Sequence, residues 1–139
     1  MMDVLEMNSG VESAVYRLLD RIGADYMKID HEPADTMEIC AGIERHLGAP
    51  ICKNLFLCNR QQTDFYLLMI PAGKVFKTKY LSSQLGCARL SFASEEQMLG
   101  YLGIRPGSVS PMGLMNDRGG KVRLVIDRDL LVLDTFGCH

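Results

Sequence analysis

The sequence contains no tryptophan, only three histidines and no apolar stretch long enough to cross a membrane. Its longest apolar runs, such as Phe65–Pro71, fall well short of the ~18 residues that a membrane-spanning helix requires. The first residues are acidic and lack the basic and then apolar segments of a secretory signal peptide. These absences argue against a membrane partner and predict a cytoplasmic location.

Other common chemical signatures are also missing. The five cysteines are odd in number and contain no CxxC pair, which favours reduced, partly buried thiols over a disulfide framework or a metal site. No HExxH, GxSxG, dinucleotide-binding or phosphate-loop motif occurs. We therefore expect neither a metal nor an organic cofactor.

What is present is an ordinary globular composition with an uneven charge distribution. The 139 residues are 47% hydrophobic and 23% charged, which predicts one domain with its own core. The net charge of −2 combines an acidic segment, residues 1–46, with a basic remainder. Residues 71–90 contain Lys74, Lys77, Lys79 and Arg89 and no carboxylate, so they predict a patch that attracts phosphate. A solvated helix face is the alternative interpretation.

Local signals predict four helices and a small sheet. Capping boxes at Ser9 and Ser94 and stops at glycines favour helices over residues 9–22, 36–47, 78–85 and 95–102, with Asp35 or Thr36 as the second cap. Apolar runs predict strands at 25–29, 51–58, 65–70, 89–92 and 121–127, with 129–133 as a further extension. Residues 104–111 are expected to be a loop. Short connections favour antiparallel neighbours, so the fold class is mixed α+β.

Lys53 and Asn54 are the first candidates for a site. Alternation along the strand at 51–58 places Lys53 on a face with Ile51, Leu55 and Leu57, where an ammonium needs a strand end or an anionic partner. Lys53 is then either an anchor for phosphate or carboxylate or a lysine that reaches solvent at the sheet margin. Asn54 offers a donor and an acceptor on the opposite face.

Two further segments are candidates. The loop Gly107-Ser108-Val109-Ser110-Pro111 has a glycine and a proline four residues apart, which predicts an exposed turn whose backbone groups point into a cavity. His139 and Cys138 are adjacent, which alone does not make a nucleophile and base. Cys52 is interpreted as a structural thiol.

Together these segments resemble the YbaK-like aminoacyl-tRNA deacylases, the fold that is also inserted in bacterial prolyl-tRNA synthetases. Within that family the chain is most similar to the free-standing alanine-editing branch of the ProX or PrdX type. The resemblance runs from about Val11 to His139 and rests on segments in a shared order: His31-Glu32-Pro33, Lys53–Leu57, Phe65–Leu68, Leu90–Glu96, Gly107–Pro111, Gly113–Asp117 and Gly137-Cys138-His139.

The resemblance implies a mostly antiparallel, partly barrel-like sheet flanked by helices, over residues 1–139. It implies hydrolysis of an aminoacyl ester on tRNA, with Lys53, Gly107 and His139 as catalytic residues. Asn54, Ser108, Val109, Ser110 and Pro111 would bind the substrate, while Lys74, Lys77 and Lys79 would contact the tRNA. The family continues after the histidine into a further strand that this sequence does not contain, so a domain without that strand is expected.

The resulting hypothesis is a trans-editing deacylase for Ala-tRNA(Pro), in which water attacks the ester in a small pocket that refuses proline. Its partners would be the acceptor end of tRNA and a prolyl-tRNA synthetase. Two alternatives remain open. One is a deacylase for Cys-tRNA(Pro) or another small aminoacyl-tRNA, and the other is a non-catalytic module that binds tRNA.

Overall fold

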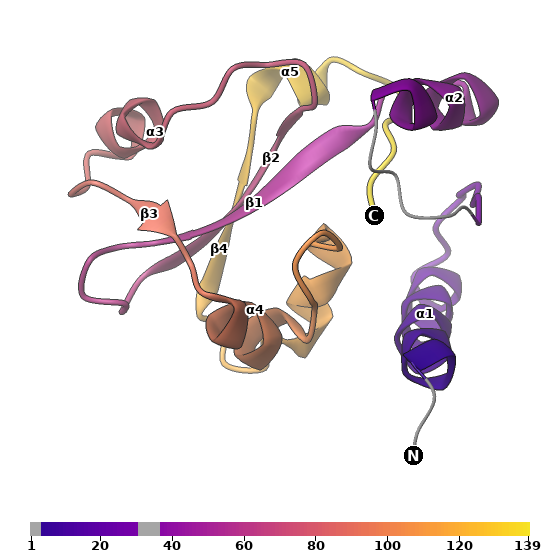
Figure 1. Ribbon diagram of the computed structural model, residues 1–139, viewed down its shortest axis with the longest axis horizontal. Coiled ribbons are helices and arrows are strands. Elements are labelled where there is room, and N and C mark those ends of the chain that lie inside the picture. Colours follow the sequence, from indigo (N-terminus) through magenta and orange to yellow (C-terminus); the bar gives the residue numbers. More distant parts are fainter. Residues whose placement is uncertain (1–3, 31–36) are drawn as a thin grey trace. The chain divides into compact units, whose positions relative to one another are not determined.

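The computed structural model describes residues 4–30 and 37–139, which fall into two compact units. The first unit spans residues 1–32 and the second residues 33–139 (Figure 1). The motif His31-Glu32-Pro33 and the predicted caps Asp35 and Thr36 lie outside the described residues. No helix in the described part of the chain is both long and apolar enough to span a bilayer.

The first unit contains helix α1 (Val4–Arg21) followed, at residues 24–30, by a segment without regular secondary structure. The helix ends as predicted, since Gly23 is left-handed with φ of 71°. It begins before Ser9, so the predicted capping box there is wrong; the preceding Leu5, Glu6 and Met7 are good helix formers and extend the helix. The strand predicted at 25–29 is also wrong. Tyr26 instead stacks on Tyr16, with ring centroids 6.2 Å apart.

The second unit is built on a hairpin. Strands β1 (Cys52–Cys58) and β2 (Phe65–Pro71) pair antiparallel as predicted, with Cys52 opposite Pro71 and Cys58 opposite Phe65. The turn is held by Asn59, whose Oδ1 accepts the backbone N–H groups of Thr63 at 2.8 Å and Asp64 at 3.0 Å. The turn therefore sets the register of the hairpin.

Two further strands complete an open four-stranded sheet in the order β3-β1-β2-β4. The short strand β3 (Ser91–Phe92) pairs antiparallel with β1, and β4 (Val122–Ile126) pairs parallel with β2. The parallel pairing is possible because the chain between β2 and β4 is long enough to cross over the sheet. The mixed α+β class with mainly antiparallel pairing is thus confirmed, and the sheet does not close.

Helices flank this sheet largely where the sequence predicts them. The structure has α2 (Met37–Leu47), α3 (Thr78–Leu85) and α4 (Glu95–Leu102), and the capping box of α4 joins Ser94 and Gln97. The predicted loop ends at Ser110, which caps a 3₁₀ helix, η1 (Pro111–Asn116). The strand extension predicted at 129–133 is wrong, because Asp127 accepts the N–H of Asp129 at 2.9 Å and starts helix α5 (Arg128–Leu131).

Apolar side chains pack on both sides of the sheet, and α3 and α4 cover opposite faces (Figure 1). On the η1 face, Phe56 and Phe65 pack with Leu102 of α4. On the α3 face, Leu57 and Leu68 pack with residues that include Leu81 and Leu90. Successive residues of β1 therefore belong to different faces, which separates Lys53 from Asn54.

Candidate active site

Asn54 connects β1 to the predicted substrate-binding loop. Its Nδ2 donates to the Val109 carbonyl at 2.9 Å, across 55 positions of sequence. Its Oδ1 accepts a hydrogen bond from the Cys52 thiol at 3.5 Å. With both ends of its amide engaged, Asn54 holds one orientation and fixes the path of the loop across the η1 face.

Ser110 extends this cluster toward the last residue of the chain. The side chain is buried, and its Oγ accepts the N–H of Met112 at 3.1 Å, which caps η1. The same hydroxyl donates to the backbone carbonyl of His139. The structure thus brings together four of the predicted site residues: Asn54, Val109, Ser110 and His139.

The shape of the loop follows from its glycines. Gly107 has φ of +85°, a conformation that favours glycine, and the Ser108 N–H closes the turn on the Arg105 carbonyl at 3.1 Å. Gly113 lets η1 approach α4, because a Cβ built there would lie 3.0 Å from the Cβ and the carbonyl oxygen of Leu102. Gly107 and Ser108 are exposed, so their backbone groups are accessible to a substrate.

Lys53 lies apart from that cluster. It is half-buried on the α3 face, and its Nζ donates to the backbone carbonyl of Lys74 at 2.7 Å. That carbonyl is the partner that makes the ammonium tolerable on an apolar face. The predicted catalytic residues are therefore divided between the two sides of β1, and their catalytic roles stay predictions.

The thiol beside Asn54 is poorly suited to nucleophilic attack. Burial, together with the nearby Cys138, raises the pKa of Cys52 to about 11. The thiol is consequently protonated at neutral pH, whereas a cysteine nucleophile reacts as the thiolate. Among the described residues, no three potential metal-binding side chains lie together. The amide of Asn54 and the hydroxyl of Ser110 are engaged in hydrogen bonds within the protein, so these side chains hold the loop in place rather than contact a substrate themselves.

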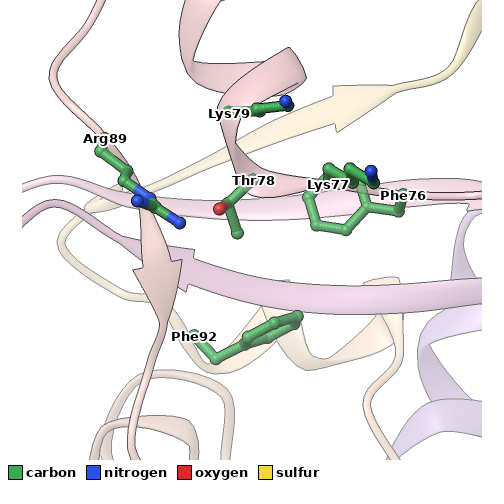
Figure 2. A pocket seen from close by; sticks show the side chains of 6 residues that line it. All are labelled: Phe76, Lys77, Thr78, Lys79, Arg89 and Phe92. Carbon is green, nitrogen blue, oxygen red and sulfur yellow. The ribbon is translucent and has the colours of Figure 1, made fainter.

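The three lysines predicted to contact tRNA have different surroundings. Lys74 Nζ forms ion pairs with Asp127 at 2.9 Å and Asp129 at 2.8 Å. Lys77 and Lys79 instead line a surface hollow of about 420 Å³ together with Phe76, Thr78, Arg89 and Phe92 (Figure 2). The two phenylalanines are not among the predicted site residues, although aromatic residues between basic ones are a signal of RNA binding that the sequence carries.

Comparisons with known proteins address the fold and the family. A family model described as "Aminoacyl-tRNA editing domain" matches residues 31–139, which include the whole second unit. Two solved structures share the fold. A hypothetical protein has a TM-score of 0.65 and 23% identity over 86% of this chain and 76% of its own. A protein from epitope-scaffold design has a TM-score of 0.67 and 20% identity, covering 88% of this chain and 75% of its own.

Curated relatives carry names that point the same way. The chain is 34% identical to "Prolyl-tRNA editing protein ProX" of Acetoanaerobium sticklandii, over 96% of this chain and 81% of that protein. It is 31% identical to "Prolyl-tRNA synthetase associated domain-containing protein 1" of Danio rerio, over 87% of this chain and 63% of that protein. These matches confirm the resemblance seen in the sequence: the chain belongs to the aminoacyl-tRNA editing domain family, the class of aminoacyl-tRNA hydrolases.

Proposed function

We propose that this protein is a trans-editing deacylase that hydrolyses Ala-tRNA(Pro). The observation that carries the proposal is the hydrogen bond from Asn54 to Val109, which orders the exposed Gly107 turn beside β1. Membership of the editing family and the similarity to ProX support the reaction type. The tRNA would be mischarged by a prolyl-tRNA synthetase, and the reaction would take place in the cytoplasm.

In the proposed reaction, water adds to the carbonyl carbon of the aminoacyl ester. The bond between that carbon and the ribose oxygen then breaks, and the ribose oxygen takes a proton, so free alanine and uncharged tRNA leave. The Ser108 N–H is already bonded to Arg105, so the Gly107 N–H would stabilise the negative charge that develops on the carbonyl oxygen, and carbonyl groups of the exposed turn would orient the water. An aminoacyl ester is already reactive, so no side-chain nucleophile is required.

Lys53 would hold the RNA rather than the ester. Its ammonium has three donors, of which the Lys74 carbonyl uses one, leaving two for a phosphate or ribose of the acceptor end. Because Lys53 and Asn54 are neighbours on opposite faces of β1, RNA bound on the α3 face would direct its last nucleotide around the end of the strand. Asn54 and Ser110 would then keep the loop in place to receive it.

Selection of alanine over proline would follow from size. A synthetase cannot strongly reject a smaller amino acid by binding alone, whereas a second site can admit only what fits. In this proposal the volume next to the loop admits alanine and refuses the proline ring. Serine and cysteine are only slightly larger than alanine and would enter the site less readily than alanine does.

The test is a deacylation panel with Ala-tRNA(Pro), Cys-tRNA(Pro) and Pro-tRNA(Pro), each labelled on the amino acid. The proposal expects rapid loss of alanine at catalytic protein concentrations and no loss of proline. Release of cysteine faster than alanine would show that Cys-tRNA(Pro), rather than Ala-tRNA(Pro), is the substrate. Decay of every ester at its spontaneous rate, together with measurable tRNA binding, would replace it with the non-catalytic tRNA-binding module.

A further inference from the structure

We propose that the hollow at Phe76 and Phe92 is part of a groove that binds single-stranded RNA by stacking bases and contacting phosphates. The identity of that RNA as the unpaired 3′ end of a tRNA rests on the proposed function above. The groove itself is inferred from its lining residues, their charge and their exposure. It consists of the 420 Å³ hollow and an adjoining one of about 490 Å³, which share Arg89 and Phe92.

The charge of the groove is of one sign. Lys77, Lys79 and Arg89 line the first hollow and Arg60 the second, and neither hollow is lined by an aspartate or glutamate. Among the described residues, no carboxylate forms an ion pair with Lys77, Lys79 or Arg89, whereas Lys74 is already paired with Asp127 and Asp129. The groove therefore keeps positive charge available for a phosphate backbone, although the whole chain is slightly acidic.

Two aromatic rings, Phe76 and Phe92, line the same hollow as these basic side chains. Phe92 is 61% exposed, so its ring is accessible at the surface. Phe76 meets it edge-on, with ring centroids 6.4 Å apart and planes at 77° (Figure 2). Exposed rings beside basic side chains are typical of proteins that stack the bases of single-stranded RNA. A duplex keeps its bases paired and cannot use these rings.

The walls of the groove are held in place by a buried serine. Ser82 Oγ donates to the Thr78 carbonyl at 2.7 Å and accepts the N–H of Leu90 at 2.9 Å. This links α3, which carries Lys79, to the segment that carries Arg89. A preformed groove loses less conformational entropy on binding than a mobile one.

The groove also lies within reach of the candidate active site. Phe92 pairs with Leu57 of β1, three residues along the strand from Asn54. Asn54 is on the opposite face, so the RNA would follow β1 from Leu57 to its end at Cys52, roughly 16 Å at ~3.3 Å per residue, and then turn toward the loop. Lys53 shares the α3 face with Leu57, so RNA leaving the groove would meet Lys53 before it reaches the end of β1.

The experiment measures fluorescence anisotropy of a labelled single-stranded RNA, roughly eight nucleotides long and carrying no amino acid, against the same RNA annealed as a duplex. The protein should bind the single strand more tightly than the duplex. Phe92→Ala should weaken binding roughly 5- to 140-fold, the loss expected for one stacked base. Leu99→Ala is its control, because Leu99 is equally exposed at 60% but lies on α4 outside both hollows.

Charge is tested separately with Arg89→Gln, which should weaken binding and reduce the salt slope by about 0.7. Arg118→Gln, an exposed arginine outside both hollows, should leave binding unchanged. Wild-type affinity in both Phe92→Ala and Arg89→Gln would overturn the proposal, as would equal affinity for single strand and duplex. RNA binding through the groove without ester hydrolysis would contradict the proposed function alone, and hydrolysis unaffected by these variants would contradict the groove alone.

Discussion

The Asn54 side chain donates to the Val109 carbonyl at 2.9 Å, so a residue of the central hairpin holds a loop that follows α4. Asn54→Leu removes the donor and leaves the carbonyl without this partner, which should cost about 1 kcal/mol of stability. Because the loop would lose its fixed path, the deacylation rate should fall by more than the loss of stability alone explains. Rates with Ala-tRNA(Pro) and the thermal midpoint measure the two effects.

Wild-type rates in Asn54→Leu would contradict a positioning role for this side chain. Asn54→Gln is the matched variant, since it keeps the amide and should retain part of the activity if the amide can still reach Val109. A drop in kcat with little change in KM is expected, because the loop is proposed to act on the water and the developing charge.

Lys53 should matter for function more than for stability. Lys53→Gln keeps a donor for the Lys74 carbonyl and removes the charge, so its thermal midpoint should stay within about 3 °C of wild type. Turnover of Ala-tRNA(Pro) should be lost, since a neutral amide binds phosphate poorly. A large loss of stability with normal turnover after refolding would show that the lysine is structural.

Lys74 should make stability depend on pH through Asp127. Burial tends to raise the pKa of Asp127, but the Asp129 N–H and the Lys74 ammonium outweigh it and lower the pKa below its usual value. A carboxyl group with a lowered pKa stabilises the fold at neutral pH, and that stability is lost as the pH falls through its folded-state pKa. Lys74→Gln should therefore lower the thermal midpoint at neutral pH, and its difference from wild type should shrink below about pH 4.

Thermal unfolding at a series of pH values checks this, with Lys121→Gln as the control for removing an exposed lysine. A difference between Lys74→Gln and wild type that stays constant down to the lowest pH would contradict the coupling to Asp127. Because Lys74 is engaged in this way, the same variant should change RNA affinity less than Arg89→Gln does.

Gly113 and Gly100 provide a paired test of packing. Gly113→Ala would place a methyl group 3.0 Å from Leu102, so it should destabilise the protein by about 1–3 kcal/mol. Gly100→Ala lies within α4 with nothing near the added Cβ, so it should stabilise by about 0.5–1 kcal/mol. Denaturant unfolding should give changes of opposite sign in the free energy of unfolding of the two variants. Equal changes would show that η1 does not pack closely on α4.

Ser82 allows the groove and the fold to be separated. Ser82→Ala removes the acceptor of the buried Leu90 N–H and should cost about 1–3 kcal/mol. Ser83→Ala, its exposed neighbour, should change stability little. If the groove is preformed by this link, Ser82→Ala should also weaken RNA binding at temperatures where the variant is still folded. Unchanged affinity there would show that the link serves stability alone.

The sequence predicted those elements whose signals are local. Glycine stops and the Ser94 capping box marked helix ends, and the polar turn at Asn59 marked the hairpin. The parallel partner of β2 depends on a long crossover, which no short window of sequence reveals. The apolar run at 129–133 is compatible with a strand or a helix, and the Asp127 cap, one residue before the helix, decides for the helix.

The same limit applies to the site. Motif resemblance selected Asn54, Val109, Ser110 and His139, and the structure brings these together. The contact between Ser110 and His139 could not be predicted, since nothing in either local sequence specifies the other. The groove was half visible as a run of basic residues, but only the fold shows that Arg89 and Phe92 come to lie beside Lys77 and Lys79.

The hairpin turn at Asn59 has a consequence for how this protein tolerates change. Inserting or deleting a single residue within β1 would exchange the side chains of its two faces, moving Lys53 under η1 and Asn54 under α3. The strand would keep all its apolar residues, but the Lys53 ammonium and the Asn54 amide would each lie on the opposite face of the sheet. A register shift of one position between β1 and β2 would therefore displace Lys53 and Asn54 together, whereas a substitution changes only one of them.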